Sequence, residues 1–309
     1  MLSNRPMLSI VSPVFQAEEF LDELVERIEN TVRSITDNFE IILVDDGSID
    51  HSWDTIERLA LARSYIYGIK LSRNFGQHYA ITAGLDQARG DWVVVMDCDL
   101  QDQPEEIKKL WEKSQLGYDL VLAKRGSRKD GWLKKIPSKL FYRTLAYLTG
   151  SNQDETIANF GIYHQKVISE IVGMRESIRY FPSMVKWVGF RQSSVVVDHG
   201  VRKVGRSNYN FKRLFNLGLD IMLAYSDKPL RLTVKLGLIV AVTGFIFALY
   251  TFILYVRNEI VVLGYASLII SIWVLTGLIL ATLGMVGLYI GKIFEGVKNR
   301  PLYIIDKKI

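Results

Sequence analysis

The sequence predicts an α/β domain built on a mostly parallel sheet, followed by a two-helix membrane hairpin. Up to Lys235, β-rich apolar runs alternate with segments of helical periodicity, whereas beyond Lys235 charged residues almost disappear. The 309 residues are 49% hydrophobic and 23% charged, which excludes a disordered chain or a charged coiled coil. The net charge of +5 does not by itself indicate a nucleic-acid partner, and the single cysteine, Cys98, excludes an internal disulfide.

Five predicted strands alternate with four predicted helices in the first part of the chain. The strands are residues 8–14, 39–44, 66–71, 92–96 and 119–123, and the helices are residues 17–36, 52–63, 76–88 and a segment starting at Pro104. The run at 92–96 is almost purely apolar, which predicts a central strand buried on both faces. This alternation predicts a parallel, doubly wound sheet, and such sheets bind ligands beyond the carboxyl ends of their strands.

The unusual polar residues lie where the predicted strands end. The segments are residues 12–15 at the end of the first strand, and residues 45–48, 72–74, 97–102 and 124–125 directly after the other four. Because the carboxyl ends of parallel strands meet at one edge of a sheet, we expect these five clusters to line one crevice. The sequence contains neither a Gly-x-Gly-x-x-Gly motif nor a Walker lysine loop, so the standard dinucleotide and P-loop sites lack support.

Asp97 and Asp99 are the sharpest signal in these clusters. Two carboxylates two positions apart can reach one hard divalent cation, such as Mg²⁺ or Mn²⁺. A solvated turn is the alternative for an isolated Asp-x-Asp, but the buried strand before it favours the metal. We expect Cys98 to be a small spacer between them. Lys124 and Arg125 form either an exposed basic pair or a phosphate contact.

Two other polar segments admit both a functional and a structural interpretation. Asp45 and Asp46 precede Gly47 and Ser48, a combination typical of turns, yet a carboxylate at this depth can also accept the N–H of a nucleobase. The basic residues 202, 203 and 206 form either a basic surface or a site for a lipid phosphate.

Two uncharged runs near the end of the chain predict membrane spans. Residues 236–256 and about 264–290 are each long enough to cross a bilayer, which takes roughly 20 residues. Two buried helices of a large soluble core are the alternative, but such helices rarely lack a polar face. Lys and Arg flank the outer ends of the pair, while the connecting loop has only Arg257 and Glu259. The positive-inside rule therefore places both termini in the cytoplasm.

Residues 211–225 carry apolar side chains at helical spacing just before the first span. This pattern predicts an amphipathic helix in the membrane interface, within a juxtamembrane segment of residues 211–230. A helix packed on the preceding domain is the alternative. The predicted domains are thus residues 1–210, the juxtamembrane helix, a membrane region over residues 231–291, and a cytoplasmic tail over residues 292–309.

Several motifs resemble those of the GT-A-fold glycosyltransferases of family 2, specifically the polyprenyl-phosphate glycosyltransferases. The matching segments are PVFQAEE at 13–19, VDDGS at 44–48, SRNFGQ at 72–77, DCDLQDQPEE at 97–106, AKR at 123–125 and GRSNY at 205–209. The hairpin follows them, so the resemblance runs nearly end to end. It implies inverting transfer of a sugar from a nucleotide-sugar to a polyprenyl phosphate.

The resemblance also implies roles for individual residues. Nucleotide contacts would come from Pro13, Phe15, Glu18, Asp45, Asp46 and Arg73. Asp97, Asp99 and Gln101 would hold or orient Mg²⁺ or Mn²⁺ on the diphosphate, and Arg125 would contact the phosphates. The acceptor phosphate would lie against Arg125, Lys139, Arg202, Ser207 and Asn208.

The sequence departs from the family pattern at three places. Gln16 and Ala17 stand where relatives usually have Asn and Glu, and Asn208 replaces a common lysine. Asn159 stands where relatives often have an aspartate proposed as the catalytic base. The reaction tolerates the loss of this aspartate. The acceptor is a phosphate monoester, which is already anionic at neutral pH and needs positioning more than deprotonation.

The resemblance implies a bacterial inner-membrane protein with a cytoplasmic catalytic domain that acts on undecaprenyl phosphate and forms a homo-oligomer, such as a tetramer. Three alternatives stay open: a GDP-sugar donor in place of a UDP-sugar, a processive polysaccharide synthase, and an inactive membrane-anchored nucleotide-binding scaffold. The synthase would carry a Gln-x-x-Arg-Trp motif and further spans, which the sequence lacks. The intact segment at 97–102 argues against the scaffold, and Asn159 is the only hint for it.

Overall fold

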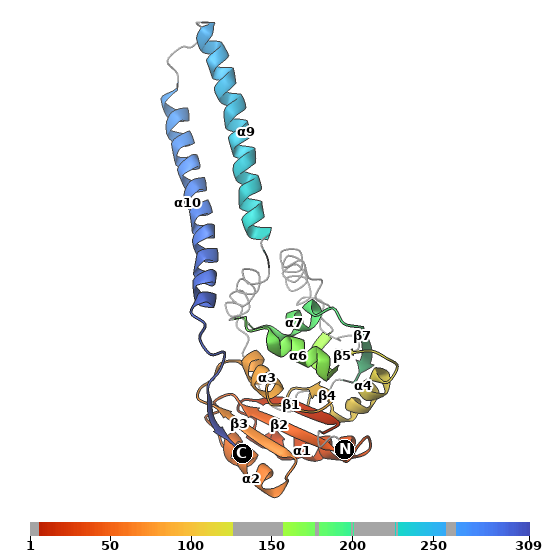
Figure 1. Ribbon diagram of the computed structural model, residues 1–309. Coiled ribbons are helices and arrows are strands. Elements are labelled where there is room, and N and C mark those ends of the chain that lie inside the picture. Colours follow the sequence, from red (N-terminus) through yellow and green to blue (C-terminus); the bar gives the residue numbers. More distant parts are fainter. Residues whose placement is uncertain are drawn as a thin grey trace. The chain divides into compact units, whose positions relative to one another are not determined.

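The computed structural model describes residues 6–125, 157–176, 179–198, 200, 226, 228–257 and 264–309. The chain divides into two compact units (Figure 1). Unit 1 comprises Met1–Ser138, Gln153–Asn208 and Arg300–Ile309, and unit 2 comprises Lys139–Asn152 and Tyr209–Asn299.

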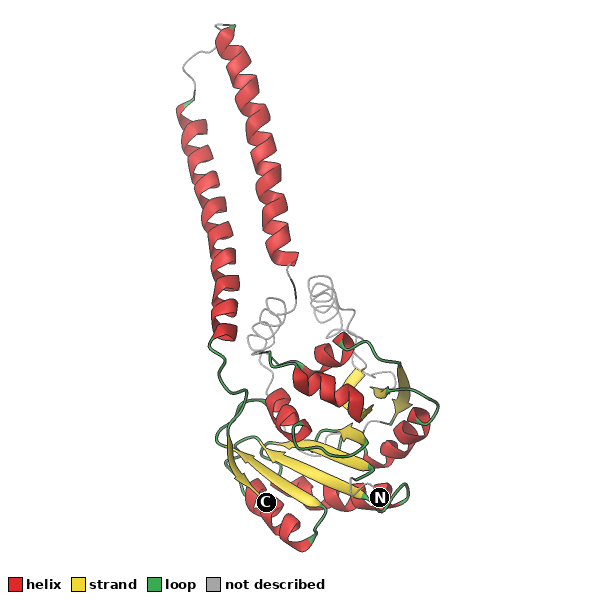
Figure 2. Cartoon of the chain, viewed as in Figure 1, coloured by secondary structure: helices red, strands yellow, loops and turns green. Residues whose placement is uncertain are grey.

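Unit 1 contains the predicted alternation of strands and helices (Figure 2). Its strands are β1 (Leu8–Val14), β2 (Phe39–Asp45), β3 (Ile66–Leu71), β4 (Trp92–Val95), β5 (Leu120–Arg125), β6 (Ile157–His164), β7 (Gln192–Val197) and β8 (Ile305–Lys308). Its helices are α1 (Glu18–Arg33), α2 (Ser52–Ala62), α3 (Gln77–Leu85), η1 (Pro104–Glu106), α4 (Ile107–Ser114), α6 (Gln165–Gly173) and α7 (Phe181–Trp187). Every element predicted before residue 125 is confirmed, with ends that differ by a few residues.

The eight strands form one sheet in the order β7-β5-β6-β4-β1-β2-β3-β8. The pairs β1–β2, β1–β4, β2–β3 and β5–β7 are parallel, so the mostly parallel sheet is confirmed. Strand β6 lies between β4 and β5 and runs antiparallel to both. Because β4 and β5 therefore point the same way, their carboxyl ends still lie at the edge where β1, β2 and β3 end.

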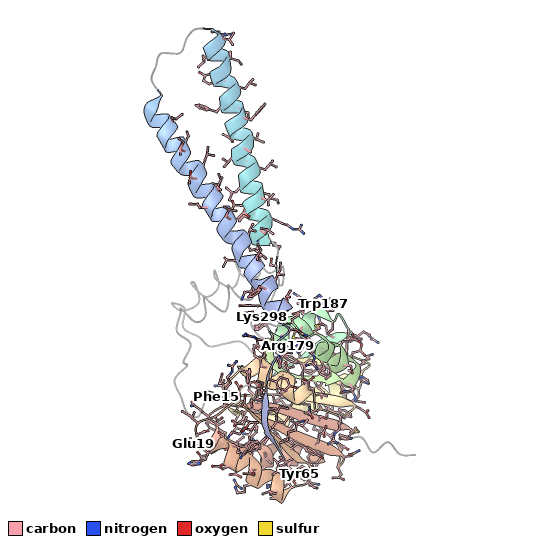
Figure 3. All side chains as sticks on the ribbon, turned by 60° about the vertical axis from the view of Figure 1, so that its left-hand side comes forward. Phe15, Glu19, Tyr65, Arg179, Trp187 and Lys298 are labelled. Atoms are coloured by element: carbon pink, nitrogen blue, oxygen red, sulfur yellow. The ribbon has the colours of Figure 1, made fainter. Side chains whose placement is uncertain are left out.

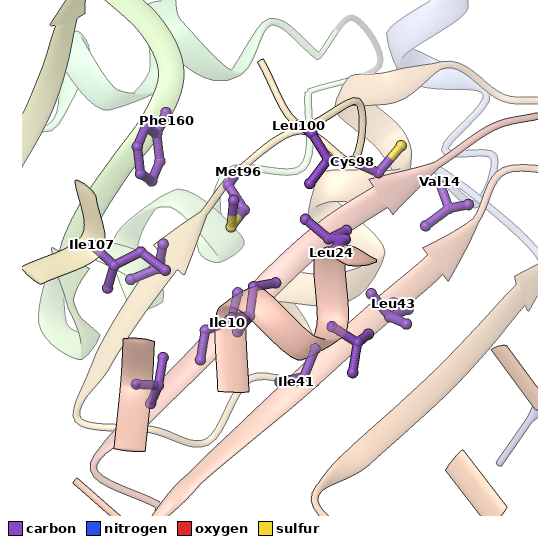
Figure 4. Packing of buried hydrophobic residues seen from close by; sticks show 14 of the residues in the cluster. Ile10, Val14, Leu24, Ile41, Leu43, Met96, Cys98, Leu100, Ile107 and Phe160 are labelled. Atoms are coloured by element: carbon purple, nitrogen blue, oxygen red, sulfur yellow. The ribbon is translucent and has the colours of Figure 1, made fainter. Parts of the chain in front are cut away.

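Helices cover both faces of the sheet, as expected for a doubly wound fold. On one face, side chains of α1, α2 and α4 pack with Ile10, Ile41 and Val94. Figure 4 shows part of this cluster, with Leu24 of α1 and Ile107 of α4 near Ile10. On the other, side chains of α3, α6 and α7 pack with Val11, Ile42 and other strand residues. Strand β4 contributes buried side chains to both clusters, which confirms that it is a central strand buried on both faces.

The end of the chain returns to unit 1 as the edge strand β8. It pairs antiparallel with β3, and Ile309 and Gly68 exchange two backbone hydrogen bonds of 3.0 Å. Just before β8, the Tyr303 hydroxyl donates to the Asp86 carboxylate at 2.5 Å. Burial and then this carboxylate raise the pKa of Tyr303, so the hydroxyl keeps the proton that it donates. The sequence pattern predicts a tail over residues 292–309 and no strand within it.

Unit 2 contains two long apolar helices, α9 (Lys228–Val256) and α10 (Tyr265–Val297). Within them, Lys228–Phe247 and Val274–Val297 are long and apolar enough to cross a membrane, with mean hydropathies of 1.9 and 2.0. Their described side chains project outward (Figure 3), and that of Phe245 is 71% exposed. Apolar side chains exposed in this way suit a lipid environment. Helix α9 starts earlier than the predicted span, and the predicted amphipathic helix at 211–225 lies outside the described residues.

Candidate active site at the carboxyl edge of the sheet

The ends of β1 and β2 form the first wall of the candidate site. Pro13 pairs with Val44 in the parallel register and is buried, whereas Phe15 is 45% exposed at the surface of unit 1 (Figure 3). Glu18 opens α1, and its carboxylate accepts the backbone N–H of His51 at 3.3 Å. An exposed ring beside strand ends gives a flat apolar surface on which a nucleobase can stack.

Asp45 is the last residue of β2 and its side chain is fully buried. Its Oδ1 accepts the backbone N–H of Ser48 at 3.1 Å. Within the described part of the chain, its Oδ2 has no hydrogen-bond partner. Desolvation raises the pKa of this carboxyl, and the contacts with Ser48 oppose that shift. An acceptor oxygen without a partner is costly in a buried place, which is consistent with a binding role.

Asp46 uses both carboxylate oxygens to hold the loop that follows β3. The Oδ1 atom accepts the backbone N–H of Phe75 at 2.8 Å, and Oδ2 accepts that of Gly76 at 2.9 Å. Burial raises the pKa of this carboxyl, while the same two hydrogen bonds lower it. Asp46 therefore positions a neighbouring loop, a role that residue type alone did not reveal.

The next residue, Gly47, lets the loop after β3 come close to the end of β2. Its φ is +68°, and a Cβ atom here would stand 2.5 Å from the carbonyl carbon of Arg73 and 2.6 Å from the amide nitrogen of Asn74. Only glycine fits such an approach at positive φ. The Arg73 guanidinium lies over the ring of Phe75, 4.1 Å from its centroid. The predicted nucleotide residues Asp45, Asp46 and Arg73 are thus brought together.

Asp97 and Asp99 follow β4 and are partly exposed. The Gln77 side chain donates to Asp97 Oδ1 at 2.6 Å, and the Asp97 backbone N–H donates to Asp102 at 3.4 Å. Asp99 Oδ1 accepts the backbone N–H of Gln101 at 3.1 Å. Both carboxylates are thus held in place at the predicted edge. Gln77 and the buried Asp102 are not among the predicted site residues, although both lie within the segments SRNFGQ and DCDLQDQPEE that resemble the family motifs.

Cys98 is buried between the two aspartates. Burial raises the pKa of its thiol to about 12, and the negative charge of Asp97 adds to the effect. The thiol is therefore neutral at physiological pH and is a poor nucleophile. Its side chain joins the apolar cluster under the site, in keeping with a spacer (Figure 4).

Strands β5 and β6 complete the edge. Lys124 and Arg125 end β5, beside Val196 and Val197 of β7. Strand β6 pairs Gly161 with Val95, the last residue of β4. Asn159 comes two residues before Gly161 on β6, and Asp97 comes two residues after Val95. Four predicted acceptor-phosphate residues lie outside the described residues: Lys139, Arg202, Ser207 and Asn208.

Comparison with known proteins gives the family. Residues 9–172 match the model of glycosyl transferase family 2. An uncharacterized glycosyltransferase of Bacillus subtilis is 34% identical over 307 residues, which cover 99% of this chain and 95% of that protein. The chain belongs to glycosyl transferase family 2. It is also 33% identical to the undecaprenyl-phosphate 4-deoxy-4-formamido-L-arabinose transferase of Proteus mirabilis, over 98% of this chain and 94% of that one.

Solved structures agree on the fold of this glycosyltransferase. A glucosyl-3-phosphoglycerate synthase from Mycobacterium tuberculosis, crystallised with Mn²⁺, UDP and phosphoglyceric acid, matches with a TM-score of 0.51 at 18% identity. The match covers 71% of this chain and 77% of that one. The GT-A fold expected from the motifs is therefore confirmed.

The donor set of the glycosyltransferase fits a hard divalent cation bound together with substrate. Within the described ranges, no group of three or more Asp, Glu, His or Cys side chains is placed to hold a metal alone. Asp97 and Asp99 supply two carboxylates, and Mg²⁺ or Mn²⁺ commonly binds one or two carboxylates plus substrate phosphates. Two carboxylates are thus a donor set that such a cation can share with substrate phosphates.

Proposed function

We propose that this glycosyltransferase moves a sugar from a nucleotide-sugar to a polyprenyl phosphate, with inversion at the anomeric carbon. The proposal rests mainly on one observation: the same chain contains a GT-A site with two neighbouring carboxylates and two exposed apolar helices. A soluble donor then meets an acceptor whose phosphate lies at the membrane surface, so the anchor supplies proximity. The Proteus mirabilis relative, named for transfer to undecaprenyl phosphate, supports undecaprenyl phosphate as the acceptor.

On the donor side, Phe15 and Asp45 would bind the nucleoside, with Pro13, Glu18, Asp46 and Arg73 around them. Asp97 and Asp99 would hold Mg²⁺ or Mn²⁺, with Gln101 orienting Asp99 through its backbone N–H. The metal would offset the charge that builds on the departing diphosphate. Arg125 would contribute a second positive charge to the same phosphates.

On the acceptor side, the attacking group is a phosphate oxygen. A phosphate monoester carries about −1.5 to −2 charges at pH 7, so it needs no general base. Asn159, on β6 two residues before the Gly161 that pairs with Val95, would position this oxygen through its neutral carboxamide. Lys139, Arg202, Ser207 and Asn208 would hold the remaining phosphate oxygens.

The strand β8 supports a hairpin topology. Unit 1 contains Gln153–Asn208, which precede the segment with α9 and α10, and Arg300–Ile309, which follow it and include the strand β8 paired with β3. A pair of spans that starts and ends at one sheet crosses the membrane twice and returns to the same side. With the positive-inside rule, we place both termini in the cytoplasm of a bacterial inner-membrane protein. The product would serve cell-envelope glycan assembly, such as O-antigen or lipopolysaccharide modification, and the protein would act as a homo-oligomer.

The test is sugar transfer by purified protein in detergent. Undecaprenyl phosphate is mixed with a panel of labelled UDP- and GDP-sugars, with Mg²⁺ or Mn²⁺ and with chelator. The expected result is metal-dependent label in the organic phase with a UDP-sugar. Label with GDP-mannose alone would show that the enzyme uses a GDP-sugar as its donor instead. Nucleotide binding without label from any donor would favour the inactive scaffold. The Asp99→Ala variant should lose transfer yet keep its unfolding temperature, and unaltered activity would refute the metal role.

A further inference from the structure

We propose that Gln77 is a positioning residue for the metal-binding carboxylate Asp97. The inference rests on the proposed function, because it assigns a role around the same metal–diphosphate site. Its starting point is the 2.6 Å hydrogen bond from Gln77 Nε2 to Asp97 Oδ1, which joins the first residue of α3 to the segment just after β4. The two residues are twenty positions apart in the chain.

The backbone at Gln77 is fixed by the neighbouring strand. Asp46, after β2, accepts the N–H groups of Phe75 and Gly76, the two residues before Gln77. Gly76 has a φ of +111°, a conformation that turns the loop sharply into the helix. Since Gly47 lets the same loop approach at atomic contact, the start of α3 has little freedom. The backbone position from which the Gln77 side chain projects is therefore fixed.

The contact with Asp97 is not a by-product of burial. The side chain of Gln77 is exposed, and an exposed glutamine that holds one rotamer loses conformational entropy. A hydrogen bond to an ionised carboxylate is among the stronger kinds and offsets that loss. The Asp102 carboxylate holds the Asp97 backbone N–H from the other side. Asp97 is thus held through its side chain and its main chain.

A carboxamide suits this task better than a basic side chain would. Gln77 donates an N–H without bringing a positive charge, so it orients Asp97 without repelling a divalent cation. An ionised carboxylate offers about four acceptor positions, so it can accept a hydrogen bond and bind a metal at the same time. Partners of this kind around metal ligands commonly change metal affinity by about 10- to 100-fold when removed. Gln77 should therefore affect how tightly the metal–diphosphate pair binds.

The experiment measures Mn²⁺ binding directly, by electron paramagnetic resonance of free Mn²⁺ in the presence of UDP and full-length protein in detergent. The Gln77→Ala and Gln77→Met variants should bind Mn²⁺ about tenfold more weakly than wild type or worse. The matched control is Gln115→Ala, which removes an exposed carboxamide at the end of α4 that donates to Ser114. This control should bind like wild type.

Turnover kinetics supply a second readout. If Asp97 is no longer positioned by Gln77, the Mn²⁺ concentration needed for half-maximal transfer should rise. The fall in kcat at saturating Mn²⁺ should be smaller. Wild-type affinity in both Gln77 variants would overturn the positioning role and leave the proposed function standing. Absence of Mn²⁺·UDP binding in the wild type would instead overturn the proposed metal site, and with it this inference.

Discussion

Substitution of Gly47 by alanine tests the close approach of the loop that follows β3. Gly47 has a φ of +68°, and a new Cβ atom would stand 2.5 Å from a backbone carbon of Arg73. Positive φ costs a residue with a side chain about 1–2 kcal/mol, and overpacking against rigid backbone adds about 1–3 kcal/mol. The variant should therefore lose about 2–5 kcal/mol of stability.

The matched control separates the two costs. Gly117 also has positive φ, +85°, but the nearest atom to its new Cβ is 3.7 Å away, at the flexible end of Arg191. Gly117→Ala should thus carry only the conformational cost. For a domain of about 200 residues, each kcal/mol lowers the unfolding temperature by about 2–4 °C. We expect Gly117→Ala to lose about 2–8 °C and Gly47→Ala to lose about 4–20 °C.

The assay is thermal unfolding in one detergent at one scan rate, followed by UDP binding in the presence of Mn²⁺. Gly47→Ala should also bind UDP more weakly, because the loop that it displaces carries Arg73 and leads into Gln77. Gly117→Ala should bind UDP normally. Equal unfolding temperatures for the two variants, with equal UDP affinity, would refute the close approach of this loop.

Two further substitutions test a buried carboxyl group at the end of β2 and a hydroxyl group just before β8. Asp45→Asn should raise the unfolding temperature at neutral pH, because desolvation raises the pKa of this buried carboxyl and so disfavours its ionised form. The sign follows from linkage: the raised pKa costs stability only as pH rises above the ordinary value of 3.8, so wild type and variant should converge in acid. A difference in unfolding temperature between wild type and variant that grows as the pH falls would contradict this. Tyr303→Phe removes the hydrogen bond to Asp86 and should cost about 1 kcal/mol, or about 2–4 °C. An unchanged unfolding temperature would mean that this bond does not help to hold the end of the chain.

The sequence predicted the first half of unit 1 because each strand and helix there carries its own local pattern. Strand β4 shows this best, since an uninterrupted apolar run of this kind is buried on both faces. Strand β6 was missed, and its place between β4 and β5 depends on a long-range pairing that no local pattern encodes. Strand β8 was missed because its four residues, IDKK, are mostly charged and form a strand only by pairing with β3.

The candidate site was predicted at the level of residue type rather than contact. The rule that ligands bind at the carboxyl edge of a parallel sheet correctly brought Asp45, Asp97 and Asp99 to one edge. The rule does not say which groups a carboxylate binds. The two backbone N–H groups on Asp46, and the Gln77 amide on Asp97, come from the path of one loop in space.

The structure of the reaction product tests the central claim most directly. The lipid product made from undecaprenyl phosphate and an α-linked UDP-sugar is purified, and its anomeric linkage and phosphate content are determined by NMR and mass spectrometry. In-line attack by the acceptor phosphate predicts a β-linked sugar on a single phosphate. An α-linked sugar would contradict inversion, and a sugar on a diphosphate would show that the enzyme transfers a phosphosugar instead.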